Sequence, residues 1–373
     1  MIVKSTELQQ VCKDILAAVD SNEISTVTET LELEADNKVL YLSVTNREYY
    51  AKVRMNIESD EHFHATVNAN LFLKLISKIT TFQIGLAVED RTLIITGNGT
   101  YRLPLIYDND TLLELPVIQI NNPSVEFIIG SDLLMSILNF NTKQLSVGTI
   151  SKPVQKLYYV DNEGALTFTS GACVNKFTLP QPVKMLLNQR LVKLFKLFRS
   201  KDVKFILGHE PISDEIIQTR VRFESDNVVI TAILSCDDAM LNSVPVHAIR
   251  QRASSVYPYS VNLNKDALED MIDRLLLFTT SNSKEVTAYS LFEFGTDSVV
   301  VYDEGRRNKE VIKYNNDTTN IEETYSATID LYDLKAVIEA LPEQYVNISF
   351  GDGQAFLVNR PNITNIIPEI HKV

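Results

Sequence analysis

Ala65-Thr66-Val67-Asn68 and Ala327-Thr328-Ile329-Asp330 are near copies of one stretch, and each ends in a residue type that caps helices. Apolar residues at helical spacing follow both copies: Leu71, Phe72, Leu75 and Ile76 in the first, and Leu334, Val337, Ile338 and Leu341 in the second. A third run follows Leu187-Asn188, at Leu191, Leu194, Phe195 and Phe198. The spacing therefore predicts the same helix three times along the chain.

Another helix is predicted at the start of each repeat. The three openings pair a small or polar residue with an acid in the first turn, where the helix dipole favours it: Ser5-Thr6-Glu7-Leu8, Gly130-Ser131-Asp132-Leu133 and Asn264-Lys265-Asp266-Ala267. Between the helices the apolar period changes to two, which indicates strands. Each block of about 125 residues is predicted to contain a helix, three strands, a second helix and three more strands.

Proline-marked segments separate the blocks. Leu115-Pro116 leads to Asn121-Asn122-Pro123, and Val244-Pro245 leads to Tyr257-Pro258. Such segments are typical of extended linkers between domains. We predict an α+β protein of three repeated domains, at residues 1–117, 121–245 and 250–373.

Composition limits the function. The chain has 373 residues, is 45% hydrophobic and carries a formal charge of −13, which argues against a protein that coats nucleic acid with its general surface. Its three cysteines, Cys12, Cys173 and Cys236, form no Cys-x-x-Cys pair, as is usual in a reducing compartment. No apolar run is long enough to span a membrane, so we expect a cytoplasmic protein without a membrane partner.

Motifs for catalysis are absent from the sequence. There is no phosphate-binding glycine loop and no nucleophile elbow. His62 and His64 lack the further ligands of a metal site, and Asp237-Asp238 fits a solvated linker. We therefore expect no catalytic residues, no metal and no cofactor, while an enzyme with an unrecognised site and a β-rich structural assembly protein stay as alternatives.

The strongest charge signal is a basic stretch. From Met185 to Lys204 there are six basic residues and one acid, which is +5 in a chain of −13 and leaves −18 for the rest. We interpret this stretch as an amphipathic helix with cations opposite its apolar face, although a solvated outer face is the plain alternative. The cations of the stretch are Arg190, Lys193, Lys196, Arg199, Lys201 and Lys204.

Further lysines extend the pattern: Lys74 and Lys78 in the first block, and Lys143, Lys152 and Lys156 in the second. Clustered cations without an aromatic ladder favour contacts with phosphates rather than bases. This predicts sequence-independent, salt-sensitive association with double-stranded DNA.

Several segments resemble one family. Residues 42–48, Leu-Ser-Val-Thr-Asn-Arg-Glu, resemble a strand ending in Thr-x-Asp-x-Glu, with Asn46 in place of the Asp. Leu93–Thr96, Tyr101–Pro104 and the turn Thr167–Gly171 resemble later strands and a Thr-Asp-Gly turn. Together with the three-fold repeat, these segments resemble the bacterial-type DNA sliding clamps, the beta subunits of DNA polymerase III.

The resemblance implies a function and its partners. It implies a non-catalytic homodimeric ring that encircles double-stranded DNA, is placed there by a clamp loader, and tethers DNA polymerase and other proteins through short clamp-binding peptides. It places Tyr101 and Leu103 opposite Leu277 and Phe278 of a second copy, although all four could be core residues.

The resemblance also implies a peptide pocket between the second and third domains, for which plain sheet packing is the alternative at the strand positions. Two departures from the family qualify these expectations. Close to its last residues the chain reads Ile366-Ile367-Pro368-Glu369-Ile370-His371 rather than a Met-Pro-Met-Arg-like strand, and the helix after Asn264 is rich in acids. The implied pocket residues are Tyr158, Thr169, Gly171, Val174, Val244, Ala355, Ile367 and Pro368.

Overall fold

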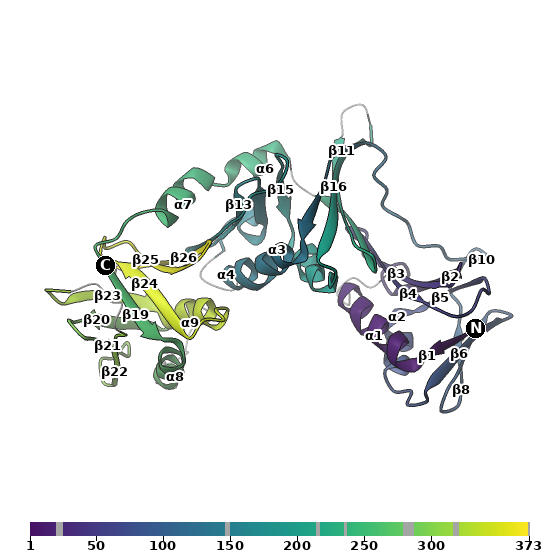
Figure 1. The fold of residues 1–373 in the computed structure, drawn as a ribbon, viewed down its shortest axis with the longest axis horizontal. Helices are drawn as coiled ribbons and strands as arrows, with labels where there is room; N and C mark the ends of the chain where they lie inside the picture. The colour runs from purple at the N-terminus through teal and green to yellow at the C-terminus, as the bar shows by residue number, and fades with distance from the viewer. Residues whose placement is uncertain are drawn as a thin grey trace. The chain divides into compact units, whose positions relative to one another are not determined.

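The computed structural model describes residues 1–19, 25–145, 150–213, 217–234, 237–278, 287–315 and 321–371. The chain divides into two compact units, each built from two separate segments (Figure 1). Unit 1 contains Met1–Leu134 and Arg190–Ser235, and unit 2 contains Met135–Gln189 and Cys236–Val373. The two units cut across the three predicted blocks, because strands of neighbouring blocks pair with each other.

The first block contains two α-helices, which pack against each other. Gln9 of the first donates its Nε2 hydrogens to the Ile76 and Ile79 carbonyls near the end of the second. Its elements are β1 (Ile2–Lys4), α1 (Ser5–Ile15), the 3₁₀ turn η1 (Leu16–Ala18), β2 (Thr30–Asp36), β3 (Val39–Thr45), β4 (Tyr49–Asn56), β5 (Phe63–Asn68), α2 (Ala69–Ile76), β6 (Gln83–Glu89), β7 (Thr92–Thr96), β8 (Thr100–Pro104), β9 (Tyr107–Asp108) and β10 (Thr111–Leu112).

The second block follows the same order with shorter helices. Its elements are β11 (Pro123–Gly130), α3 (Ser131–Ser136), the π-helical turn η2 (Ile137–Asn141), α4 (Thr142–Gln144), the 3₁₀ turn η3 (Pro153–Lys156), β12 (Tyr158–Asp161), β13 (Gly164–Phe168), β14 (Ala172–Lys176), β15 (Lys184–Leu187), α5 (Gln189–Lys193), the 3₁₀ turn η4 (Leu194–Leu197), β16 (Asp202–Pro211), β17 (Ile217–Glu224) and β18 (Val228–Leu234).

Two helices connect the second block to the third, α6 (Asp238–Ser243) and α7 (Val246–Ala253). The sequence predicts an extended linker between these blocks, and the two helices show that this prediction is wrong. The elements of the third block are β19 (Tyr259–Asn264), α8 (Lys265–Leu276), β20 (Tyr289–Phe294), β21 (Ser298–Tyr302), β22 (Lys309–Lys313), β23 (Tyr325–Asp330), α9 (Leu331–Glu339), β24 (Tyr345–Phe350), β25 (Ala355–Arg360) and β26 (Ile363–Pro368).

The three-fold repeat is confirmed, with more strands than the sequence predicts. In every block one strand precedes the first helix and a fourth strand leads into the second. The fourth strands of the first and third blocks contain the repeated stretch itself, which pairs in a sheet before its last residue caps the helix. The Asn68 side chain accepts the Leu71 N–H at 3.0 Å, and the Asp330 side chain accepts the Tyr332 N–H at 3.0 Å.

Each block contributes two sets of four strands in one fixed order. The sets around the second helix run β1-β6-β7-β8, β11-β16-β17-β18 and β19-β24-β25-β26. The sets between the helices run β4-β3-β2-β5, β14-β13-β12-β15 and β22-β21-β20-β23. Two eight-stranded sheets arise where β18 pairs with β4, which we call the first seam, and where β26 pairs with β14, the second seam.

The helices of unit 1 cover one face of its eight-stranded sheet. Phe195 of η4, which follows α5, makes an edge-to-face contact with Phe223 of the sheet, with ring centroids 5.0 Å apart. Near α1, the Tyr49 hydroxyl donates to the Ala18 carbonyl at 2.6 Å. Cross-strand pairing places the Phe223, Ile230 and Ala51 side chains on one face, and Tyr49 shares it by strand alternation. The three helical segments α1, α2 and α5–η4 therefore form one layer, since α2 packs on α1.

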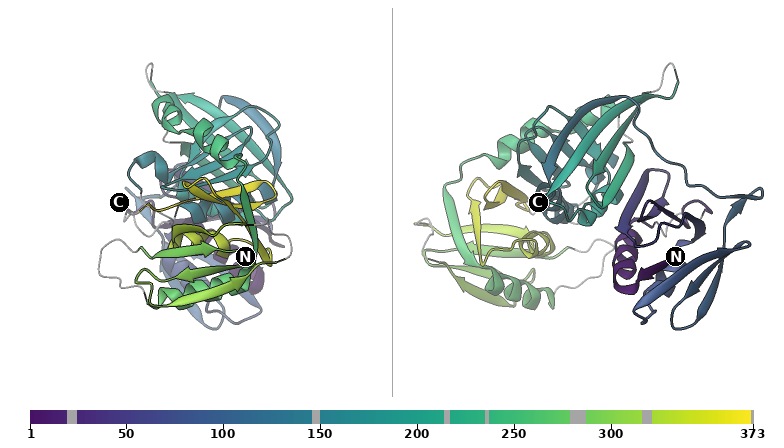
Figure 2. Two further views of the ribbon diagram at one scale, coloured as in Figure 1. Left: turned by 90° about the vertical axis from the view of Figure 1, so that its left-hand side faces the viewer. Right: turned by 45° about the vertical axis from the view of Figure 1, so that its right-hand side comes forward.

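A long connection lies against the other face of this sheet. Residues 113–122, which we call the strap, run between β10 and β11 and appear as an extended trace in Figure 2. Leu115 is buried, and the Glu210 carboxylate accepts the backbone N–H groups of Asn121 and Asn122 at 2.5 and 2.9 Å. The strap is thus fixed to β16 of the sheet at the end that leads into β11.

The predicted basic helix from Met185 to Lys204 is wrong in extent. Residues up to Leu187 belong to β15, the helical part ends at Leu197, and Lys204 lies in β16. In this segment Leu194, Phe195, Leu197 and Phe198 are all buried, although the chain leaves the α-helix after Lys193. A tight 3₁₀ turn and an extended Phe198 bring all of them to the core.

Candidate functional site

A cavity of about 360 Å³ lies over the second seam, within unit 2. Its floor contains Ala172 and Ile366, which are direct cross-strand partners in β14 and β26. The turn after β13 and the helix α7 supply walls. The lining residues are Phe168, Thr169, Ser170, Gly171, Ala172, Pro245, Ala248, Ile249, Arg252, Gln354, Ala355, Ile366 and Pro368.

Strand alternation decides which residues reach this cavity. Ile366 lines it, whereas the next residue, Ile367, is fully buried in the core on the opposite face. In β12, Tyr158 likewise points to the helical side, where its hydroxyl donates to Thr142 Oγ1 at 2.9 Å. Its neighbour Tyr159 belongs to the apolar cluster on the cavity side. Tyr158 and Ile367, both predicted pocket residues, therefore do not line this cavity.

The turn between β13 and β14 has a rigid geometry. The Thr169 N–H donates to the Gly171 carbonyl at 2.8 Å, and Gln155 Nε2 donates to the Thr169 carbonyl at 3.1 Å. A Cβ at Gly171 would lie 2.3 Å from the Ile366 carbonyl oxygen. Only glycine allows β26 to approach this closely, so Gly171 shapes the pocket through the side chain it lacks.

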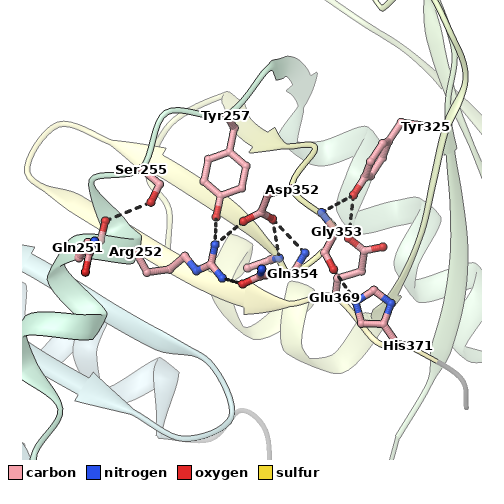
Figure 3. Close-up of polar contacts among 11 residues, drawn as sticks. Gln251, Arg252, Ser255, Tyr257, Tyr325, Asp352, Gly353, Gln354, Glu369 and His371 are labelled. Atoms are coloured by element: carbon pink, nitrogen blue, oxygen red, sulfur yellow. Dashed lines mark hydrogen bonds and ion pairs between the residues drawn. The ribbon is translucent and has the colours of Figure 1, made fainter.

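Helix α7 is fixed beside the cavity by two arginines that reach different strands. Arg250 binds Asp161 in a bidentate pair, with Nη2–Oδ1 and Nη1–Oδ2 distances of 2.6 and 2.9 Å. Arg252 contacts Asp352, Gln354 and the Tyr257 hydroxyl (Figure 3). Because Asp161 belongs to β12 and Asp352 to the turn before β25, the two arginines hold α7 across both halves of the eight-stranded sheet.

The end of β26 is fixed by the same turn (Figure 3). The Glu369 N–H donates to the Gln354 carbonyl at 2.9 Å, and the Tyr325 hydroxyl donates to Glu369 Oε2 at 2.8 Å. The C-terminal stretch, which departs from the family pattern, therefore forms part of the wall. Among the described residues that line the cavity, Arg252 is the one that carries a charge.

Half of the predicted pocket residues line the cavity, namely Thr169, Gly171, Ala355 and Pro368. Val174 and Val244 lie in the buried apolar cluster that continues from its floor. The residues of α7 were missed because the segment reads as a linker. Its helical signal is the i, i+3, i+7 spacing of Val246, Ile249 and Ala253.

The cations predicted to bind DNA fall into two groups in unit 1. Arg190 pairs with Glu48 at 3.6 Å and Arg199 pairs with Asp14 at 2.5 Å, so these charges are partly neutralised. The others are exposed on the helical layer and form no ion pair with any residue in the described part of the chain: Lys193, Lys196, Lys74 and Lys78.

The remaining predicted cations are scattered. Lys201 is exposed just before β16. Lys204 of β16 pairs with Glu126 of the neighbouring strand β11 at 2.8 Å. In unit 2, Lys143 pairs with Glu339 at 3.5 Å, while Lys152 and Lys156 are exposed around η3. The acidic α8 pairs its residues with cations of its own unit, such as Glu269 with Lys265.

The four predicted interface residues differ in exposure. Leu277 and Phe278 follow α8 and are 80% and 56% exposed, which is unusual for adjacent large apolar residues. Tyr101 is half-buried on β8, an edge strand, and Leu103 is buried against its own sheet. Three of these residues are thus available to a partner, and Leu103 belongs to the core.

Within the described residues, no three His, Cys, Asp or Glu side chains come together in an arrangement that could hold a metal ion. None of the helices in the described part of the chain combines the length and the apolar character needed to cross a bilayer.

The fold is that of known replication proteins. The crystal structure of the DNA polymerase sliding clamp from Bacillus subtilis matches with a TM-score of 0.76, over 100% of this chain and 99% of that chain, at 16% sequence identity. The Helicobacter pylori beta clamp bound to a DNA ligase peptide matches with the same TM-score, coverage and identity. The chain has the fold of the bacterial DNA sliding clamps. The resemblance seen in the sequence is confirmed at this level.

Sequence similarity to the clamps is weaker and partial. The beta sliding clamp of Helicobacter pylori strain J99 is 23% identical over 184 residues, which covers 43% of this chain and 48% of that clamp. The clamp of strain 26695 is 26% identical over 135 residues, or 35% of its length. The chain therefore matches about half or less of the length of these curated clamps, and no protein-family model matches it.

Proposed function

We propose that this protein is a non-catalytic DNA sliding clamp, which encircles duplex DNA as a homodimeric ring and tethers replication proteins to it. The observation that carries the proposal is a pair of unmatched sheet edges. β4 and β14 pair at seams, and their equivalent β22 is an edge strand. β18 and β26 pair at the same seams, and their equivalent β8 is an edge strand.

A second copy of the chain satisfies both edges. If β8 of one copy pairs with β22 of the next, a third seam forms with the strand order of the other two. Two chains would then close a ring of six blocks, because the same contact occurs twice head to tail. The exposed Leu277 and Phe278, and the exposed Val311 on β22, supply apolar surface for such a contact.

The helical layer would face the DNA. Lys74, Lys78, Lys193 and Lys196 are exposed cations without acidic partners in the described chain, and they suit loose contacts with phosphates. An overall charge of −13 would repel DNA from the outer surface. Ring closure rather than affinity would then hold the protein on the duplex.

The cavity at the second seam would dock partner proteins. It is concave and mostly apolar, and a clamp of the same fold has been solved with a DNA ligase peptide. We propose that DNA polymerase, a clamp loader and other partners bind it through short peptide segments.

The decisive test loads the protein onto nicked circular DNA with a compatible clamp loader. A sliding clamp stays on the circle through a high-salt wash and is lost when the circle is cut. Equal retention on circular and linear DNA would contradict the proposal, as would failure to survive the wash on circles.

A further inference from the structure

We infer that the first seam carries a second docking groove, which binds short extended partner segments with an acidic side chain beside an aliphatic one. The groove belongs to unit 1 and is separate from the cavity at the second seam. A cavity of about 410 Å³ lies there between the strap and the sheet. Its position does not depend on ring closure or on DNA binding.

The two seams are equivalent in topology, and both carry a cavity under the segment that connects their blocks. In unit 2 the floor includes the cross-strand pair Ala172–Ile366, and α7 forms the wall. In unit 1 the floor includes the cross-strand pairs Tyr50–Thr231 and Lys52–Val229, and the strap forms the wall. The cavity volumes are similar, at about 410 and 360 Å³.

The chemistry of the first-seam cavity differs from that of the second. Two cations, Lys52 and Arg222, line it, and no carboxylate of the described residues does. Each cation has an acid outside the lining, Glu34 and Glu224, both at 3.1 Å and partly exposed. Exposed pairs of this kind are held weakly, so a ligand carboxylate can exchange with them.

One of these two cations has a buried polar atom without a partner among the described residues. Arg222 Nε is buried, and no group in the described chain accepts its hydrogen bond. A buried donor without an acceptor is unfavourable unless a ligand or water supplies one. Because Nε has almost no accessible surface, a ligand carboxylate in the cavity would instead meet the partly exposed remainder of the Arg222 side chain, which with Lys52 makes the lining cationic.

The strap offers the remaining contacts. Val117 is 54% exposed, and with Ile118 and Ile120 it provides the aliphatic part of the lining. The N–H groups of these three residues donate to no other group among the described residues, so they remain available to the backbone of an extended peptide. The strap stays in place because Arg220 Nη1 also donates to the Gln119 carbonyl at 2.6 Å. These features together favour an extended, acidic and aliphatic segment.

The test uses a phage-displayed library of random heptapeptides selected on the full-length protein, with counter-selection on the Lys52→Gln/Arg222→Gln double variant. We expect the recovered peptides to contain Asp or Glu beside an aliphatic residue. Their fluorescein-labelled forms should bind the double variant at least about tenfold more weakly by fluorescence polarisation. Val117→Glu, an exposed change that leaves the core intact, should weaken binding similarly because it repels the ligand carboxylate.

Two matched controls separate the grooves. Arg54→Gln removes a cation that lies on β4, as Lys52 does, but outside the first-seam cavity. Arg252→Gln removes the cation of the second-seam cavity. Neither change should alter the affinity of the recovered peptides. The inference is overturned if no peptide is enriched, if enriched peptides lack acids or bind the double variant equally, or if a duplex oligonucleotide displaces them.

Discussion

At the residue scale, adjacent side chains of one strand have different roles. Ile366 lines the second-seam cavity, and Ile367 packs between the sheet and the helices with no exposed surface. Their chemistry is identical, so only the alternation of the strand distinguishes them. Substitution of each by alanine therefore separates binding from stability.

We expect Ile367→Ala to lower the free energy of unfolding by about 2–5 kcal/mol, since it leaves a cavity in the core. Ile366→Ala should weaken a docked peptide more than it destabilises the fold. Urea denaturation and fluorescence polarisation with a clamp-binding peptide measure the two effects. If Ile366→Ala proves the more destabilising of the two, the assignment of the faces is wrong.

Glu210 provides a pH-dependent contact for the strap. Hydrogen bonds from the Asn122 and Asn121 backbone amides hold the pKa of its carboxyl below the ordinary value, against the opposing effect of burial. Because the pKa of Glu210 is lower in the folded than in the unfolded chain, its ionised carboxyl stabilises the fold at pH values above the unfolded pKa of about 4.3. This stabilisation is lost as the pH falls through the folded pKa.

Glu210→Gln should therefore lower the urea midpoint at pH 7, and the difference from the unsubstituted protein should shrink as the pH falls below about 4. Glu114→Gln, an exposed change in the same strap, serves as the control and should leave the midpoint unchanged. A constant difference at all pH values would show that the charge of Glu210 does not anchor the strap.

At the element scale, the short α5–η4 segment carries both kinds of cation. Arg190 and Arg199 each face an acid of the first block, whereas Lys193 and Lys196 are exposed without one in the described chain. Cations already paired release fewer counterions when they meet a phosphate. The lysines should therefore dominate the salt dependence of DNA binding.

Lys193→Ala/Lys196→Ala should reduce the slope of log K against log salt by about 0.9 for each lost phosphate contact. Arg190→Ala/Arg199→Ala should reduce it less, although both double variants remove two charges. Fluorescence anisotropy with a duplex oligonucleotide at several salt concentrations gives both slopes. Equal slopes for all three proteins would exclude this segment from the DNA interface.

At the scale of the whole molecule, the proposal depends on β8 and β22 meeting in a dimer. The native mass should be near twice 42.1 kDa. Leu277→Lys/Phe278→Lys places two charges in the proposed contact, so we expect a monomer that no longer stays on circular DNA but still binds peptide. Light scattering after size exclusion measures the mass.

The control for this change is Val256→Lys, because Val256 is 97% exposed and lies outside both edge strands. It should leave the mass unchanged. A protein that is monomeric before any substitution, or a Leu277/Phe278 variant that remains dimeric, would contradict the ring.

Local sequence determined the repeat. The caps at Asn68, Asn264 and Asp330 form as the sequence predicts, because a capping side chain and the apolar spacing after it act within a few residues. The predicted basic helix is shorter than the sequence indicates, because the chain changes from α-helix to a 3₁₀ turn at Leu194 and is extended at Phe198. Tyr158 and Ile367 lie on the side of the sheet away from the second-seam cavity, because the face of a strand residue depends on register, which the sequence pattern did not reveal.

The sequence by itself determined the α+β class, the three-fold repeat and the excess of negative charge, since each follows from composition or short-range spacing. Only the tertiary structure decided which strands join blocks, which residues meet at the seams and which cations find an acid. Those outcomes depend on contacts between residues far apart in the chain, such as Arg199 with Asp14 and Arg252 with Asp352, whose geometry no local pattern encodes.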